Sequence, residues 1–122
     1  GITPLMSMLR SLAERGDRRP LTLLYANREW EQVTFREELG ELSGRLNLKV
    51  IHVLEKPEPG WSGETGFINR EILTRHLPDL RQRDRVEIFI CGPGPMMDAV
   101  ERQLDGLGAW AGDFHSERFN FV

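Results

Sequence analysis

The stretch IFICGPGPMMDAV, from Ile88 to Val100, decides the fold, because an apolar run leads into a turn rich in glycine and proline and then into a helical pattern. The run 86–92 shows no strict alternation, which is typical of a strand covered on both faces of a parallel sheet. Pro95 stands near the first turn of a segment in which apolar residues recur at spacings of three and four. The stretch therefore predicts a strand, a tight turn and a helix, the repeating unit of an α/β protein.

The same alternation continues along the rest of the chain. Apolar runs at 21–26 and 48–55 predict two more buried strands, and 115–122 predicts a weaker fourth one. The segment 55–66 is rich in proline and glycine and predicts a long loop. Three helix starts carry residues suited to capping: Thr3, Thr34 with Glu37 as a capping box, and Asn69. We therefore expect an α/β fold with a doubly wound, Rossmann-like parallel sheet and right-handed crossovers.

Composition bounds the class of protein. The chain has 122 residues with a formal net charge of -3, which predicts one ordinary domain over 1–122 and no basic surface for nucleic acid. Cys91 is the only cysteine, so the chain has no internal disulfide and no cysteine-based zinc site, which fits a reducing compartment. The three histidines show no ligand spacing, so we expect no metal. We expect the chain in the cytoplasm, or on the cytoplasmic side of a membrane-bound parent.

The pattern starts on a helix, whereas a doubly wound fold starts with a strand. The sequence therefore predicts a fragment whose first, central strand lies upstream of Gly1. Without that strand, the edges of 21–26 and 86–92 are either unpaired or paired with each other. The fragment is expected to self-associate if those edges remain unpaired.

Four motifs, in the order GITPLMSMLR, TGFI, CGPGPMM and ERF, resemble the nucleotide-binding half of the ferredoxin-NADP reductase family over essentially all 122 residues. The resemblance implies an NAD(P)H-binding domain that follows an FAD-binding β-barrel in a flavin oxidoreductase. No barrel motif is present in this sequence, so the barrel is expected upstream. Implied partners are that FAD-binding domain and an acceptor domain or protein with iron-sulfur, haem or ferric iron. The fragment alone is not expected to catalyse hydride transfer.

The first predicted binding turn leads into the N-terminal helix. Its free backbone N–H groups and the helix dipole attract a pyrophosphate, and Thr3 adds a hydroxyl donor. A plain helix cap is the alternative. The residues assigned to this turn are Gly1, Ile2, Thr3 and Pro4.

The second predicted turn follows the strand 86–92, at the edge where open α/β folds bind ligands. Its glycines let the backbone approach a flat ring, and its prolines hold the turn rigid. The resemblance places Cys91, the predicted catalytic contact, beside the nicotinamide carbon that gives up hydride; the alternative is a small buried side chain. The cofactor-binding residues assigned here are Gly92, Pro93, Gly94, Pro95 and Met96.

Two further pairs complete the predicted site. Asn27 and Arg28 follow the strand 21–26, where doubly wound folds meet the adenosine ribose, and Arg28 favours NADPH whereas nearby acidic residues favour NADH. The resemblance places Glu117, the second predicted catalytic residue, near the nicotinamide carboxamide and Phe119 over a ring, with strand packing as the alternative for Phe119. Two other functions stay open, a nucleotide-sensing module with the same fold and a flavodoxin-like FMN carrier.

Overall fold

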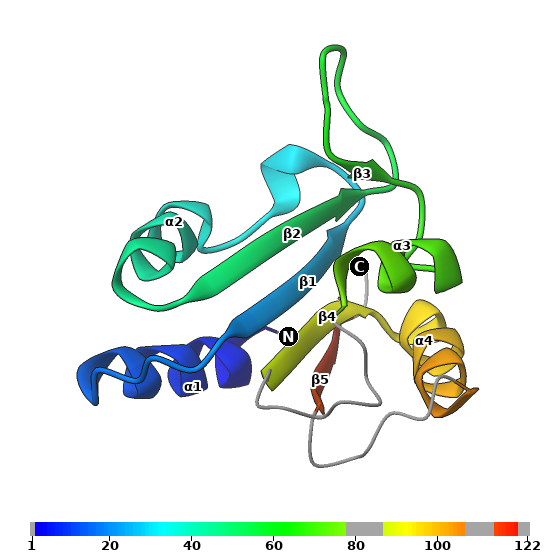
Figure 1. Ribbon diagram of the computed structural model, residues 1–122. Helices are drawn as coiled ribbons and strands as arrows, with labels where there is room; N and C mark the ends of the chain where they lie inside the picture. Colours follow the sequence, from blue (N-terminus) through cyan, green and yellow to red (C-terminus); the bar gives the residue numbers. More distant parts are fainter. Residues whose placement is uncertain (1, 78–86, 107–113, 120–122) are drawn as a thin grey trace.

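The computed structural model describes residues 2–77, 87–106 and 114–119, and its strands form one parallel sheet in the order β3-β2-β1-β4-β5 (Figure 1). All four pairings are parallel. This confirms the doubly wound α/β fold. The strands are β1 (Leu21–Asn27), β2 (Leu48–Leu54), β3 (Glu64–Thr65), β4 (Glu87–Pro93) and β5 (Phe114–Phe119).

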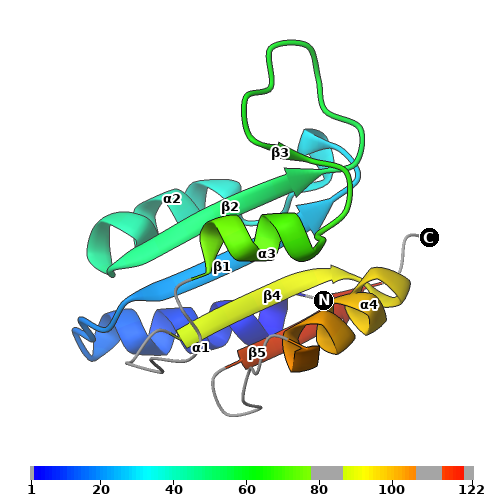
Figure 2. The same ribbon diagram turned by 45° about the vertical axis from the view of Figure 1, so that its right-hand side comes forward.

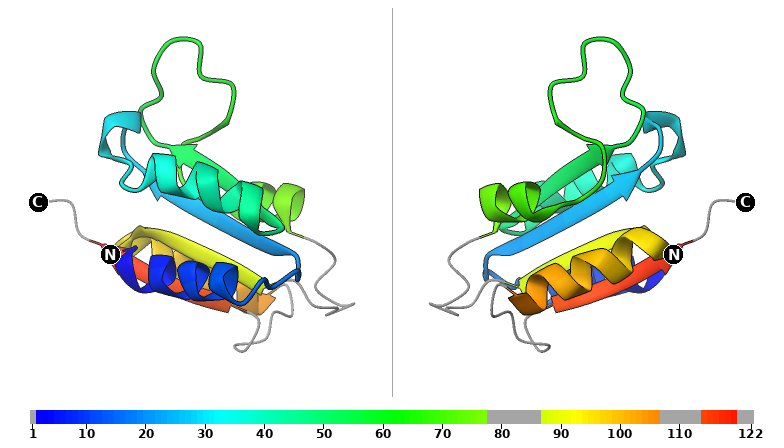
Figure 3. Two further views of the ribbon diagram at one scale, coloured as in Figure 1. Left: turned by 90° about the vertical axis from the view of Figure 1, so that its left-hand side faces the viewer. Right: turned by 90° about the vertical axis from the view of Figure 1, so that its right-hand side faces the viewer.

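Helices cover both faces of the sheet. Opposite views show α1 and α2 on one face and α3 and α4 on the other (Figure 3). None of the helices within the described ranges is long and apolar enough to cross a membrane. The helices are α1 (Thr3–Glu14), the short 3-10 helix η1 (Trp30–Gln32), α2 (Arg36–Arg45), α3 (Arg70–His76) and α4 (Gly94–Gly106).

Alternate side chains of the central strands feed two apolar cores, as the period of two along a strand requires. Tyr25 and Phe89 point into the core under α1 and α2, which includes Leu5, Leu9 and Leu42. The next residues along each strand point into the core under α3 and α4. That second core includes Leu24, Ile51, Ile72, Ile90, Met97 and Val100. Both faces of β1 and β4 are thus buried, which explains their continuous apolar sequences.

The strands β1 and β4 pair directly with each other. Their register runs from Leu21 opposite Glu87 to Tyr25 opposite Cys91. Of the two outcomes left open by the sequence for these edges, the structure has the paired one. Self-association through these two edges therefore loses its basis, since each edge has a neighbour.

Two of the three predicted helix caps are wrong. Thr3 is already the first residue of α1, the capping position belongs to Ile2, and no side chain caps that end. The second helix starts one residue later than predicted, after Phe35 in a left-handed conformation with φ of 62°. Thr34 instead has its hydroxyl 2.9 Å from the Tyr25 hydroxyl, so a tertiary contact takes the place of the capping box.

The third predicted cap is confirmed, and the predicted loop contains a short strand. Asn69 caps α3 as predicted, since its Oδ1 accepts from the Ile72 N–H at 2.9 Å. The predicted loop 55–66 contains the short strand β3, which pairs with Val53 and Leu54 of β2. Two residues are too few for a periodic pattern, so β3 left no signal in the sequence.

Candidate functional site

The ends of β1, β4 and β5 meet the start of α1 at one edge of the sheet, which we call the carboxyl edge. The strands are parallel and therefore finish at the same edge. The start of α1 lies beside the end of β4 (Figure 2), and Ile2 and Cys91 belong to one apolar core. The two predicted binding turns are thus brought together. In open α/β sheets ligands bind at this edge.

The start of α1 presents free donors to this edge. Ile2 is buried, while Thr3 and Pro4 are exposed and form the first turn of the helix. That turn contains no acidic residue, so nothing within it neutralises the positive end of the helix dipole. An exposed helix start of this kind favours an anionic ligand such as a phosphate. Gly1 was also assigned to this turn and lies outside the described residues.

The turn between β4 and α4 brings backbone and side chains into close contact. A methyl group placed on Gly92 would lie 2.2 Å from Met96 Cε and 3.3 Å from Ala26 Cβ. Met96 is buried, while Pro95 is exposed at the start of α4. The strand β4 includes Pro93, and α4 begins at Gly94 without an intervening loop. Only glycine fits the space at position 92 without a shift of its neighbours.

Cys91 lies one residue before this turn and is fully buried, with 0% of its surface exposed. Its side chain packs in the core under α1 and α2, together with Leu5 and Phe89. The thiol is therefore enclosed in the core, as in the alternative of a small buried side chain. It packs here as a small apolar side chain. Contact with a nicotinamide ring stays a prediction for this residue.

Asn27 ends β1 at the same edge and carries an unsatisfied donor. Only 6% of the residue is exposed, and its Nδ2 is buried without a hydrogen-bond partner. The alternation of β1 places this side chain on the same face as Tyr25 and Cys91. A buried amide without a partner is costly, so the position favours a ligand that accepts from Nδ2.

Arg28 follows Asn27 and meets a carboxylate that the sequence analysis did not consider. Its Nε lies 4.0 Å from Glu55 Oε2, and both side chains are about one-third exposed, at 40% and 32%. Two backbone bonds fix this geometry, from the Glu55 N–H to Asn27 C=O at 3.0 Å and from the Lys56 N–H to Arg28 C=O at 2.7 Å. The carboxylate and the guanidinium therefore stand together where β1 and β2 end.

Glu117 and Phe119 are placed at the same edge by the register of β5. Glu117 lies opposite Cys91, and Phe119 lies opposite Pro93. Both positions therefore belong to the group of residues around the second binding turn. Their assignment to the site agrees with this placement along the strand, and their roles toward a cofactor stay predictions.

Sequence reasoning missed three contributors at this edge. Glu55 could have been found, since parallel pairing brings the ends of neighbouring strands together. Phe67 is 55% exposed just after β3, and an exposed aromatic ring offers a stacking surface. Tyr25 holds the segment after β1 through its hydroxyl, which accepts from the Thr34 N–H at 3.3 Å. The last contact joins a strand to a turn and has no local sequence signal.

Within the described ranges, no three residues among His, Cys, Asp and Glu form a group that could hold a metal ion. The polar groups at the carboxyl edge are instead amide, hydroxyl and backbone donors, with one guanidinium beside a carboxylate. Such donors suit phosphate and ribose oxygens.

A parallel α/β sheet whose turns present these donors at one edge defines a nucleotide-binding domain of the Rossmann-like class. The chain belongs to the oxidoreductase NAD-binding domain family, whose model matches residues 1–102. This agrees with the resemblance drawn from the four sequence motifs.

Relatives of this chain include NADH-cytochrome b5 reductase 1 of Pyricularia oryzae, 32% identical over 112 residues, covering 88% of this chain and 36% of the relative. The NADH nitrate reductase of Spinacia oleracea is 39% identical over 112 residues, covering 88% of this chain and 12% of the relative. This chain thus spans about a third or less of these two relatives.

Solved structures of reductase domains have a similar fold. The cytochrome b5 reductase domain of Ulva prolifera nitrate reductase has a TM-score of 0.77 at 26% identity, covering 96% of this chain and 45% of that one. The CS-b5R domains of human Ncb5or, in an NAD+ form, have a TM-score of 0.79 at 28% identity, covering 95% of this chain and 33% of that one.

Proposed function

We propose that this chain is the nicotinamide-nucleotide lobe of an FAD-dependent oxidoreductase, and that it binds NADH at the carboxyl edge. The observation that carries the proposal is the buried, unpartnered Nδ2 of Asn27, beside the start of α1 and the turn after β4. Such a donor is satisfied when a ligand oxygen reaches it. Family membership supports a pyridine nucleotide as that ligand.

The residues at the edge fit the parts of a dinucleotide. The start of α1 would hold the pyrophosphate through backbone N–H groups and the exposed Thr3 hydroxyl. The close backbone at Gly92 would let the nicotinamide ring lie against the turn. Glu117 and Phe119, one strand further along the sheet, would contact the carboxamide and cover a ring.

The bound nicotinamide supplies the hydride, and the residues of this chain orient it and exclude water. The turn from Cys91 to Met96 is suited to orientation because two prolines restrict its backbone. Cys91, buried beneath this turn, would support the backbone against which the ring lies, without acting as a nucleophile. We therefore assign Cys91 and Glu117 to positioning of the reacting ring.

We propose NADH rather than NADPH as the preferred cofactor. Glu55 stands 4.0 Å from the Arg28 guanidinium, which weakens the hold of that guanidinium on a 2'-phosphate. A carboxylate at this point accepts from a ribose 2'-OH and repels a phosphate dianion. Two named relatives, the reductase of Pyricularia oryzae and the nitrate reductase of Spinacia oleracea, are described as NADH enzymes, which supports the same choice.

The flavin and the acceptor are proposed to lie in other parts of a longer protein. The family resemblance supports an FAD-binding barrel as the neighbouring domain and an iron-sulfur, haem or ferric centre as the acceptor. Cytochrome b5 reductases and a nitrate reductase among the relatives support a haem-type acceptor. The exposed ring of Phe67 lies at the end of β3 and offers an apolar contact for nucleotide or domain.

Calorimetric titration with NADH and with NADPH tests the proposal in the wild type and in the variants Glu55→Gln and Asn27→Ala. We expect NADH to bind more tightly than NADPH in the wild type, because Glu55 opposes the extra phosphate. Glu55→Gln should improve NADPH relative to NADH by roughly tenfold, or about 1.4 kcal/mol. Asn27→Ala should weaken both cofactors alike, since it removes a contact that does not depend on the 2'-phosphate.

Two results would contradict the proposal separately. Absence of binding for both nucleotides in the wild type, with the protein folded by circular dichroism, removes the nucleotide-binding function. An unchanged preference in Glu55→Gln leaves that function in place and removes Glu55 from the choice of cofactor.

A further inference from the structure

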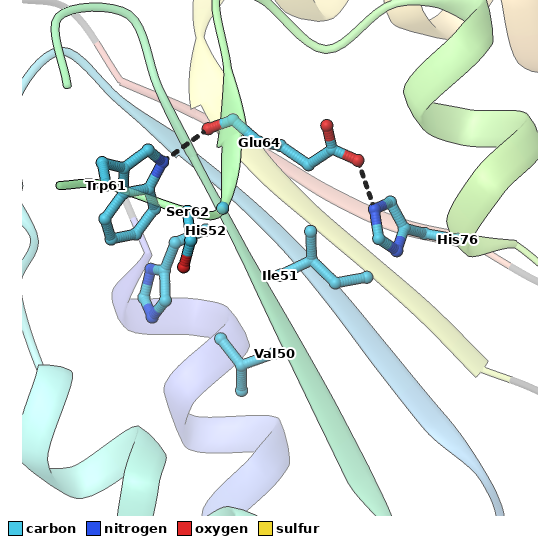
Figure 4. A pocket seen from close by; sticks show the side chains of 8 residues that line it. Val50, Ile51, His52, Trp61, Ser62, Glu64 and His76 are labelled. Carbon is cyan, nitrogen blue, oxygen red and sulfur yellow. Dashed lines mark hydrogen bonds and ion pairs between the residues drawn. The ribbon is translucent and has the colours of Figure 1, made fainter.

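A pocket lies away from the carboxyl edge, along the outer side of β2. It has a volume of about 450 Å³, within the range of small-molecule sites. Its walls come from β2, β3, the loop before β3 and the end of α3. Trp61 and His52 lie on one side of β2, while Ile51 and His76 lie on the other (Figure 4). The pocket therefore surrounds the edge of the strand and lies in the plane of the sheet.

The floor of this pocket carries main-chain groups of β2 that face outward. Alternate residues of a strand point their N–H and C=O groups to opposite sides. The C=O of Leu54 accepts from the Gly66 N–H at 2.8 Å, on the β3 side, whereas the Glu55 N–H reaches Asn27 on the β1 side. By the same alternation, the groups of Val50 and His52 point outward, toward the pocket.

Among the described residues, β3 pairs with β2 only at Val53 and Leu54. The C=O of Val50 and the N–H of His52 therefore stand next to each other without a neighbouring strand. An acceptor and a donor at positions i and i+2 of one strand edge match a ligand that carries a donor beside an acceptor. A planar ligand can satisfy both while lying in the plane of the sheet.

The side walls suit an aromatic ligand. The Trp61 ring is fixed by its Nε1–H, which donates to Glu64 C=O at 2.9 Å, and by Gly63, where an added methyl group would lie 2.7 Å from Cζ2. Trp30 packs against the Trp61 ring at 5.5 Å between centroids. A ring held in one orientation gives stacking energy at little cost in entropy.

The electrostatics favour a neutral ligand. The Glu64 carboxylate accepts two hydrogen bonds from Arg75, at 2.7 and 2.9 Å, and a third from His76. Its charge is thus already compensated at the rim of the pocket. Burial, with a smaller contribution from the Arg36 charge, lowers the pKa of His52, so this imidazole is neutral at neutral pH. None of these groups carries an uncompensated charge that would attract an ionic ligand.

We infer that this pocket is a binding site for a small, neutral, planar heteroaromatic amine of one or two rings. Its exocyclic N–H donates to Val50 C=O, its ring nitrogen accepts from the His52 N–H, and its face lies near Trp61. An extended peptide fits less well, because a strand that continued along β2 would collide with β3 at Glu64. The site is separate from the proposed dinucleotide site and does not depend on it.

The test uses 4-aminoquinazoline as the probe and backbone amide NMR of the whole chain as the readout. We expect a Kd of roughly 0.1–1 mM, which is reasonable for a ligand of this size. The largest amide shift should fall on His52. The matched probe 4-(dimethylamino)quinazoline lacks N–H donors and should bind at least tenfold more weakly.

Two variants and a competitor separate this site from others. Ser62→Phe places a large ring in the pocket and should abolish binding, whereas Ser11→Phe, the same change at an exposed position of α1, should leave the Kd unchanged. Saturating NADH should also leave the Kd unchanged. The inference is overturned if the probe does not bind at 5 mM, roughly five times the highest expected Kd. It is also overturned if NADH displaces the probe, or if the shifts centre on Asn27 and Arg28.

Discussion

The two strands that flank β1 differ in how far they are enclosed. The strand β4 has neighbours on both sides and buries five consecutive residues, Ile88 to Gly92. The strand β2 is less enclosed, with Lys49 exposed and Val50 and His52 half-buried, and among the described residues its outer side is paired only at its last two positions. The enclosed strand leads into the proposed nucleotide-binding turn, while the open strand leaves main-chain groups in a pocket. Enclosure fixes geometry, and an incomplete edge leaves hydrogen-bonding capacity for a ligand.

Two truncations to alanine, one on each strand, should give the largest difference in the free energy of unfolding. Phe89→Ala on β4 removes a side chain with 0% exposure and should lower the free energy of unfolding by about 3–5 kcal/mol. Val50→Ala on β2 removes a half-buried side chain and should cost about 1 kcal/mol or less. Urea denaturation measures both. If Phe89→Ala prevents folding, Phe89→Leu gives the same comparison with a smaller loss. Equal losses in the free energy of unfolding for the two strands would contradict the difference in enclosure.

Two glycine substitutions test whether NADH binding depends on the turn after β4 and not on the open edge of β2. Gly92→Ala forces the buried Met96 side chain to shift next to the turn and should weaken NADH binding about tenfold, near 1.4 kcal/mol. Gly63→Ala displaces Trp61 at the open edge and should leave NADH affinity unchanged while altering tryptophan fluorescence. Calorimetric titration of both variants checks this. A loss of NADH affinity in Gly63→Ala alone would reverse the assignment of the two regions.

The smallest expected effect concerns pH at the open edge. Hydrogen bonds from Arg75, followed by His76, lower the pKa of Glu64 from 4.5 to about 2. Because the folded-state pKa is depressed, this contribution to stability is complete above pH 4.5 and disappears as the pH falls toward 2. The contribution should be about 0.5–1 kcal/mol, as for other partly exposed ion pairs.

Urea midpoints of wild type and Glu64→Gln, measured between pH 7 and 2, isolate this effect from that of the other carboxyl groups. The two curves should converge as the pH approaches 2. A constant difference across this range would mean that the ion pair does not stabilise the fold.

The central part of the fold could be predicted because both faces of β1 and β4 are buried. Burial on two faces requires consecutive apolar residues, and that pattern is visible without a structure. The strand β3 was not predicted because it has only two residues. Its pairing with β2 depends on the path of the preceding loop, which the sequence does not specify. The cap predicted at Thr34 failed because a hydroxyl contact with Tyr25 outweighed a local motif.

The candidate site could be predicted only where strand ends carry recognisable turns. The glycines and prolines after Cys91 mark the turn directly. The pairing of Arg28 with Glu55 and the isolation of Asn27 Nδ2 depend on strands that are far apart in sequence. Burial of the Cys91 thiol depends on the packing of α1, which no local pattern specifies.

The direct pairing of β1 with β4 has a consequence for how the chain folds. Leu21 and its partner Glu87 are separated by 66 positions (87 minus 21), whereas Leu21 and Leu48 are separated by 27 (48 minus 21). Closing the longer segment costs more chain entropy before any contact is gained, and nonlocal parallel pairing slows folding. We therefore expect β1 to pair with β2 more readily than with β4 as the chain folds.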